Sequence, residues 1–186
     1  MSFALEYMHW LKKTIGRFLQ WLCPCSDANA RLFQGLAIGP NTYYAQRNLD
    51  GIAPQLITIG SDCVLAPTAM ILTHDAASFI HTGKYRFAPV KIGDRCFLGY
   101  NSVIMPGVII GNDVIVGAGA IVTRFVPDGA VVGGVPARII GRTAEVMQKW
   151  RDQLVEAPYP FGSMPTPDDL LELQRRAVAA HTKAQP

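Results

Sequence analysis

His74 is the residue whose type and position first suggest chemistry. It stands just before residues 77–91, which interrupt an otherwise regular six-residue repeat. Loops inserted into a rigid scaffold often carry function, and imidazole, with an ordinary pKa of ~6.5, can take or give a proton near neutral pH. From the residues alone, His74 is either a proton-transfer group or a histidine bonded to the backbone at a corner. His81, inside the loop, fits an exposed or lining position.

The four cysteines are the other candidates for chemistry. Cys63 and Cys96 each stand fifth in a six-residue block, a position held by small residues, so we expect both thiols in the interior. Cys23 and Cys25 flank Pro24, which is too tight for an easy disulfide, and no second pair stands nearby to complete a zinc site. We therefore expect reduced thiols and no bound metal.

Composition limits the class of protein. Of 186 residues, 49% are hydrophobic and 17% charged, and the formal net charge is +3. This charge is too small to indicate nucleic-acid binding. The N-terminus lacks the pattern of a secretory signal, and no apolar run reaches the ~18 residues that a membrane span needs. We expect a cytoplasmic protein, either free or held at the inner face of the membrane.

The element that must position His74 is the repeat itself. Residues 92–127 divide into the blocks IGDRCF, LGYNSV, IMPGVI, IGNDVI, VGAGAI and VTRFVP. The first residue is always Leu or β-branched, the second is usually Gly, and the fifth is never large. This period predicts an all-β fold, a parallel β-helix with three blocks in each coil. We expect the first residue to point inward and the glycine to give the backbone freedom at the bend.

The repeat also predicts the domain organisation. Residues 1–30 contain an amphipathic helix, with an apolar face over 3–22, followed by a break. This helix packs on its own domain or a neighbouring subunit, or it lies on a membrane surface. Residues 31–142 form the β-helix with the inserted loop 77–91, and residues 143–186 form an extension with helices over 143–155 and 167–180.

Three further motifs carry a resemblance to a known family. They are THD at 73–75, the loop that precedes Ile92, and GGVPARIIGR at 133–142. Together with the repeat, they resemble the hexapeptide-repeat acyltransferases. Residues 57–142 are most similar to the maltose, galactoside and nodulation O-acetyltransferases and to those of surface-polysaccharide synthesis. The resemblance implies a left-handed β-helix, a homotrimer, and acetyl transfer from acetyl-CoA to a carbohydrate hydroxyl or amine.

The resemblance also implies roles for particular residues. His74 falls on the family's general base, which would act in direct transfer without an acyl-enzyme. Asp75 is a poor partner for it because adjacent side chains on an extended backbone point to opposite faces. A backbone carbonyl or a distant carboxylate is favoured. The positions that match the CoA site are Tyr100, Ala118, Thr123, Arg124 and Arg138, and the candidate acceptor contacts are Gln46, Asn48 and Asp75.

Two other classes of protein remain open at this point. A γ-type carbonic anhydrase shares the prism but binds zinc through three histidines, whereas only His74 and His81 lie in or near the coils here. A noncatalytic scaffold or membrane-docking subunit is suggested by the N-terminal helix and by Tyr100, a bulky residue where the groove should be open.

Overall fold

A computed structural model describes residues 35–158, 161 and 165–183 of the chain. The expected amphipathic helix at 3–22, together with Cys23 and Cys25, lies outside the described residues.

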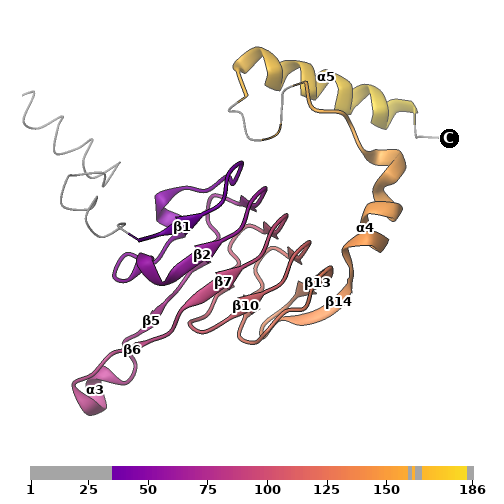
Figure 1. Cartoon of the computed structure of the whole chain (residues 1–186). Coiled ribbons are helices and arrows are strands. Elements are labelled where there is room, and N and C mark those ends of the chain that lie inside the picture. Colours follow the sequence, from indigo (N-terminus) through magenta and orange to yellow (C-terminus); the bar gives the residue numbers. More distant parts are fainter. Residues whose placement is uncertain (1–34, 159–160, 162–164, 184–186) are drawn as a thin grey trace, which may run out of the picture. The chain divides into compact units, whose positions relative to one another are not determined.

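Three sheets, here named A, B and C, are visited in turn by the chain, and their strands run parallel except at the last pair of sheet B (Figure 1). Sheet A contains β1 (Ala37–Ile38), β2 (Ile57–Ile59), β7 (Val90–Ile92) and β10 (Ile109–Ile110). Sheet B contains β3 (Val64–Leu65), β8 (Phe97–Leu98), β11 (Ile115–Val116), β13 (Ala130–Gly133) and β14 (Arg138–Arg142). Sheet C contains β4 (Met70–Ile71), β9 (Val103–Ile104) and β12 (Ile121–Val122). This order confirms a parallel β-helix with three sides.

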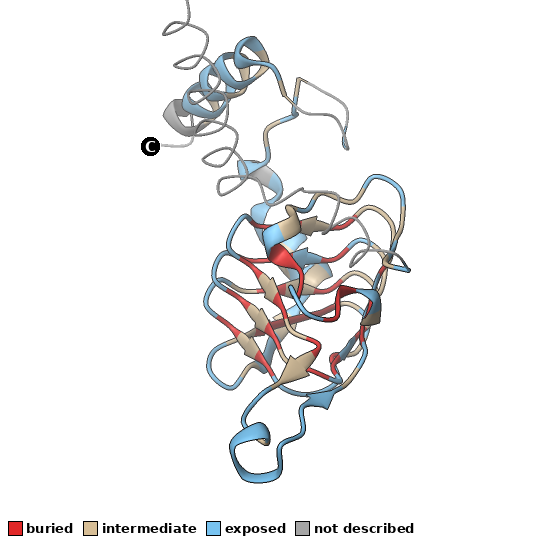
Figure 2. Ribbon diagram, turned by 90° about the vertical axis from the view of Figure 1, so that its left-hand side faces the viewer, coloured by how far each residue is buried: buried red, intermediate tan, exposed pale blue. Residues whose placement is uncertain are grey.

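The strand register follows the six-residue blocks. Ile92 pairs with Ile110, and Ile104 pairs with Val122, so residues eighteen apart lie one coil above each other. The leading residue of each block points inward and is no more than 3% exposed. Figure 2 shows these buried positions inside the stack of coils. The regular coils therefore form a rigid support for the less regular segments on either side.

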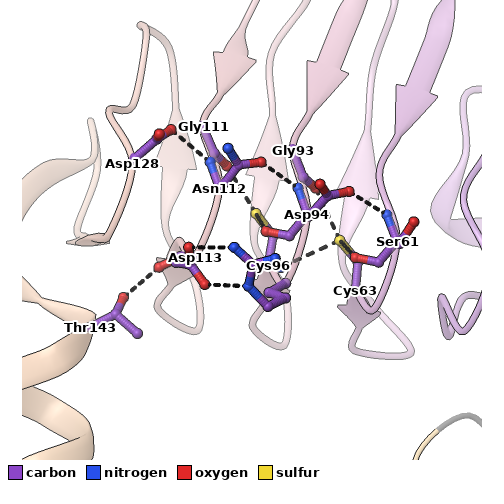
Figure 3. A network of polar contacts seen from close by, with 11 residues as sticks. Ser61, Cys63, Gly93, Asp94, Cys96, Gly111, Asn112, Asp113, Asp128 and Thr143 are labelled. Carbon is purple, nitrogen blue, oxygen red and sulfur yellow. Dashed lines mark hydrogen bonds and ion pairs between the residues drawn. The ribbon is translucent and has the colours of Figure 1, made fainter.

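The second-position glycines have a different cause from the one expected. At Gly93, an added Cβ would lie 2.5 Å from Oδ1 of Asn112 in the next coil. At Gly60 and Gly111 it would lie similarly close to Oδ1 of Asp94 and of Asp128. Close stacking of the coils, and not freedom of φ, therefore requires glycine there. Figure 3 shows that each of these oxygens accepts a hydrogen bond from a backbone N–H of the neighbouring coil; Asn112, for example, accepts from Asp94. The left-handed φ occurs instead at the fourth position, at Asp62, Arg95, Asn101, Gly107, Asp113 and Gly119.

The insertion after sheet C is a projecting hairpin. Strand β5 (His74–Asp75) pairs antiparallel with β6 (Arg86–Phe87), and α3 (Phe79–Thr82) lies at the tip, exposed to solvent (Figures 1 and 2). The expected loop 77–91 ends two residues too late. Val90 and Lys91 already belong to β7, where they pair with β2 of the coil below.

The coils before and after the regular stack are less regular. The early coil contains the 3₁₀ turns η1 (Gln46–Asn48) and η2 (Pro54–Leu56). After β14 come α4 (Thr143–Trp150), η3 (Arg151–Gln153) and α5 (Pro167–Lys183). The Oγ1 atom of Thr143 donates to the carbonyl of Asp113 at 2.7 Å, which ties the start of α4 to the coils (Figure 3). No helix within the described ranges is long and apolar enough to cross a membrane.

Candidate active site

The imidazole of His74 is held by a buried carboxylate. Its Nδ1 lies 2.6 Å from Oδ2 of Asp50, whose side chain is fully buried, whereas the His74 side chain remains 21% exposed. A carboxylate can only accept a hydrogen bond, so Nδ1 carries the proton in the neutral ring. Nε2 is therefore left with a lone pair, which is the arrangement that a general base requires.

Asp50 is fixed by several donors at once. Its Oδ2 also accepts from the backbone N–H groups of Thr73 at 2.7 Å and His74 at 3.1 Å. Its Oδ1 accepts from those of Ile52 at 2.7 Å and Ala53 at 3.3 Å. Burial by itself raises the pKa of Asp50, but the hydrogen bonds from Thr73, Ile52, His74 and Ala53 outweigh burial and hold the pKa well below its usual range. Asp50 is therefore an ionised, rigidly oriented partner of His74.

Sequence reasoning missed Asp50, although it favoured a distant carboxylate or a carbonyl over Asp75. Asp50 precedes His74 by a full coil and comes close because Leu49 pairs with Ile71 across sheet C. One signal was available: counted in sixes from Ile38, Asp50 stands first in the block DGIAPQ, where the repeat calls for an apolar residue, although in the structure Leu49 takes that place. Asp75 instead accepts a hydrogen bond from the N–H of Ala77 at 2.8 Å, within its own turn.

The corner that holds His74 also holds two of the predicted CoA residues. Strands β4, β9 and β12 stack in register, so the segments that follow them lie above one another. His74 follows β4, and Thr123 and Arg124 follow β12, two coils away. Because strands are spaced about 4.8 Å apart, this separation is roughly 10 Å along the prism. Thr123 and Arg124 are both exposed there.

A cavity of about 300 Å³ opens at the end of the stack of coils, where the buried side chains of Val122, Val126 and Val132 form its floor. Arg124 and Arg138 line it together with the apolar side chains of Phe125 and Ile139. Two guanidinium groups beside apolar walls suit a ligand that has phosphates next to a less polar part. The structure thus brings together Thr123, Arg124 and Arg138 of the predicted set, although Thr123 does not line the cavity.

The other two predicted CoA residues lie at a different corner. Tyr100 and Ala118 are in the turns between sheets B and C, one coil apart as their spacing predicted, and the N–H of Gly119 donates to the carbonyl of Tyr100 at 2.7 Å. At Gly99 an added Cβ would lie 2.6 Å from the backbone nitrogen of Ala118, so the two coils touch there. Sheet C separates this corner from the one that holds His74 in the same chain.

The candidate acceptor residues have mixed positions. Asn48 is fully buried, and its amide nitrogen donates to the carbonyls of Ala66 at 2.9 Å and Ala69 at 2.6 Å. The structure therefore gives Asn48 a role in holding the coil, not in contacting an acceptor. Gln46 is half-buried within η1, and Asp75 lies half-buried on β5 beside His74.

The two thiols in the coils form hydrogen bonds in the protein interior. Cys63 donates to the carbonyl of Gly93 at 3.1 Å and Cys96 to that of Gly111 at 3.0 Å, and both residues are buried (Figure 3). Contact with the Cys63 thiol, together with burial, raises the pKa of Cys96. Neither sulfur is placed as a nucleophile. Across the described part of the chain, no group of three His, Cys, Asp or Glu could hold a metal ion.

Comparisons with known proteins identify relatives of the repeat. The family model for the hexapeptide repeat of succinyl-transferase matches residues 89–124. The chain is 40% identical over 120 residues to YvoF of Bacillus subtilis (strain 168), which is named as an acetyltransferase; the match covers 64% of this chain and 67% of YvoF. It is 35% identical over 106 residues to WbbJ of Escherichia coli (strain K12), named as a lipopolysaccharide biosynthesis O-acetyl transferase, covering 50% of this chain and 54% of WbbJ.

The chain thus spans about two thirds of YvoF and about half of WbbJ. Among solved structures, a maltose O-acetyltransferase from Clostridium difficile 630 superposes with a TM-score of 0.50 at 28% identity, covering 60% of this chain and 72% of the other. The six-residue repeat, the three-sided coil and these relatives lead to one conclusion: the chain belongs to the hexapeptide-repeat acetyltransferase family.

Proposed function

We propose that this protein transfers an acetyl group from acetyl-CoA to a hydroxyl or amine of a carbohydrate, with His74 as the general base. The observation that carries the proposal is the 2.6 Å contact between Nδ1 of His74 and the buried carboxylate of Asp50. A hydroxyl is a weak nucleophile until its proton is removed, and an oriented imidazole can remove it.

The chemical step can be written for these residues. Nε2 of His74 takes the proton of the acceptor hydroxyl while the acceptor oxygen bonds to the acetyl carbon. The imidazolium that forms is stabilised by the Asp50 carboxylate. The tetrahedral intermediate then breaks its carbon–sulfur bond, and His74 returns the proton to the leaving thiolate. No acyl-enzyme is formed, in keeping with the buried positions of Cys63 and Cys96.

Acetyl-CoA is proposed to bind along the corner after sheet C. Arg124 and Arg138 would pair with its phosphates, because guanidinium groups form charge-assisted hydrogen bonds with phosphate oxygens. The chain of pantetheine would then run along the prism past Thr123 toward His74. The separation of roughly 10 Å between these positions is within the reach of an extended pantetheine arm.

A carbohydrate acceptor is supported by the names of the relatives. WbbJ is named for lipopolysaccharide biosynthesis, and the solved neighbour is a maltose O-acetyltransferase. We therefore propose a role in the synthesis of a surface polysaccharide. We further propose that the protein acts in the cytoplasm and that the amphipathic helix predicted from the sequence of residues 3–22 brings it to the inner face of the membrane.

We further propose that three copies assemble around a three-fold axis, each with the left-handed β-helix that the family resemblance implies. On β3, β8 and β11 of sheet B and on all three strands of sheet C, the outward side chains are apolar: Val64, Phe97 and Ile115 on B, and Met70, Val103 and Ile121 on C. Sheet A instead mixes Thr58 and Lys91 with the apolar Ile109. Two adjacent apolar sides allow each copy to pack against two neighbours.

Release of the CoA thiol tests the proposed activity. Purified protein and acetyl-CoA are offered maltose, methyl galactoside, nucleotide sugars and serine in separate reactions. We expect turnover with a sugar, and a fall in kcat of roughly 10²- to 10⁴-fold in His74→Ala with the KM for acetyl-CoA nearly unchanged. The control His81→Ala changes an exposed histidine of the same hairpin. Wild-type turnover in His74→Ala, or an acetyl-cysteine trapped by mass spectrometry, would contradict the mechanism.

A further inference from the structure

The hairpin that begins at His74 has two chemically different faces. In its register His74 lies opposite Phe87, and Asp75 lies opposite Arg86. Because side chains alternate between the faces of a strand, His74 and Phe87 share one face, and Asp75 and Arg86 share the other. Tyr85 precedes Phe87 by two residues and lies on the face of His74. The charged pair is therefore kept away from the imidazole.

Three rings surround one spot on the His74 face. The centroid of the His74 ring is 6.4 Å from that of Tyr85 and 6.2 Å from that of Phe87, and the Tyr85 and Phe87 centroids are 6.2 Å apart. Phe79, from α3, extends the group with its ring centroid 4.9 Å from that of Tyr85. The base thus forms one corner of a nearly equilateral triangle of rings.

These rings are not simply packed in a core. Tyr85 is 45% exposed and Phe87 is 48% exposed, although each lies within ring contact of a residue whose partner, Asp50, is fully buried. Large aromatic side chains gain most from being covered. Tyr85 and Phe87 are half-exposed and lie beside the general base, so the acceptor molecule can cover them when it binds.

The chemistry of the surface selects the kind of acceptor. A pyranose ring has a face of C–H groups, which stacks on aromatic rings, and hydroxyls around its rim. We infer that Tyr85 and Phe87 bind the C–H face of a pyranose acceptor and hold one rim hydroxyl at Nε2 of His74. The inference rests on the proposed function. It makes the two rings determinants of acceptor specificity, while Arg124 and Arg138, in their cavity two coils away, serve the donor.

Two ring variants and one control from the same hairpin test this assignment. Tyr85→Ala and Phe87→Ala each remove one ring, and Tyr85→Phe keeps the ring while removing its hydroxyl. The control Ile80→Ala changes a side chain of α3 that is 85% exposed. With methyl galactoside or maltose as acceptor, each ring deletion should raise the acceptor KM about 3- to 10-fold, since aromatic contacts of this type contribute modestly. Tyr85→Phe and Ile80→Ala should match wild type, as should the acetyl-CoA KM of every variant.

A binding experiment separates this inference from the proposed activity. Saturation-transfer NMR with methyl galactoside uses His74→Ala in the presence of CoA, so no turnover is needed. We expect transfer to the C–H protons of one face of the sugar, and its loss when Tyr85→Ala and Phe87→Ala are combined. Saturation transfer as strong in that triple variant as in His74→Ala alone would overturn the inference. An unchanged acceptor KM in the ring variants would also overturn it, as would a changed oligomer mass in those variants. Sugar binding without thiol release would instead count against the proposed activity alone.

Discussion

Replacing Asp50 by Asn tests the catalytic role of the carboxylate with the least change in shape. The amide keeps one oxygen but converts the other into an N–H donor. Three donors face Oδ2 and two face Oδ1, so the amide should keep its oxygen toward His74 and turn its nitrogen toward Ile52 and Ala53. His74 then keeps its tautomer and loses only the negative charge beside the developing imidazolium.

The size of the effect follows from that charge. A hydrogen bond to a charged group contributes about 1.5–3 kcal/mol, compared with about 0.5–1.5 kcal/mol for a neutral one. The difference is about 1–1.5 kcal/mol, so we expect kcat to fall roughly 5- to 12-fold, because each ~1.4 kcal/mol changes a rate tenfold. If the amide turned the other way, Nε2 would hold the proton and the fall would reach that of His74→Ala. In neither case should the KM for acetyl-CoA change.

The assay is thiol release at saturating acceptor, with Asp128→Asn as the matched control. Asp128 accepts one hydrogen bond, from the backbone N–H of Asn112 at 2.8 Å, which an amide oxygen can also accept. The double variant Asp50→Asn with His74→Ala should be no slower than His74→Ala alone, since the two residues act as a unit. An unchanged kcat in Asp50→Asn, or additive losses in the double variant, would refute the reasoning.

The same residue sets a dependence of stability on pH. The pKa of Asp50 is lower in the folded protein than its ordinary value, so the unfolded chain binds the proton more readily. The stabilisation is complete above an unfolded pKa of ~3.9 and is lost as the pH falls toward the folded pKa. Urea unfolding at pH 5 and pH 3 should therefore show a larger loss of unfolding free energy for the wild type than for Asp50→Asn. Equal losses in the two proteins would argue against the hydrogen-bond network.

Three further predictions concern the rest of the molecule. Arg138→Ala should raise the KM for acetyl-CoA about 10- to 100-fold and leave the acceptor KM unchanged. The control Arg175→Ala, on α5 and outside the cavity, should change neither KM. Kinetics with dephosphorylated CoA check that Arg138 contacts a phosphate. Light scattering at micromolar concentration should give the mass of a trimer, and a fully active monomer would exclude the proposed assembly. Deletion of residues 1–26 should leave CoA binding intact while changing solubility or membrane association; loss of folding would show that the segment belongs to the core.

The sequence by itself determined the scaffold. Because the leading residue of each block is Leu or β-branched and recurs every six positions, each coil can place its apolar side chains inward only at one register, and that register is the observed one. The fifth-position rule also put Cys63 and Cys96 in the interior correctly. Even so, the role of the glycines was misjudged, since a clash with the next coil cannot be seen in a local pattern.

Only the tertiary structure decided how the site is assembled. His74 and Asp50 are 24 residues apart, in coils where the repeat fails, and no local period predicts which segments stack there. The register of the hairpin, which puts Tyr85 and Phe87 beside the imidazole and Arg86 away from it, likewise depends on strand pairing. The six-residue period is a pattern among residues close together in the chain, so it can be read from the sequence. The partner of a catalytic base is a property of stacking between coils, which the chain acquires only when it folds.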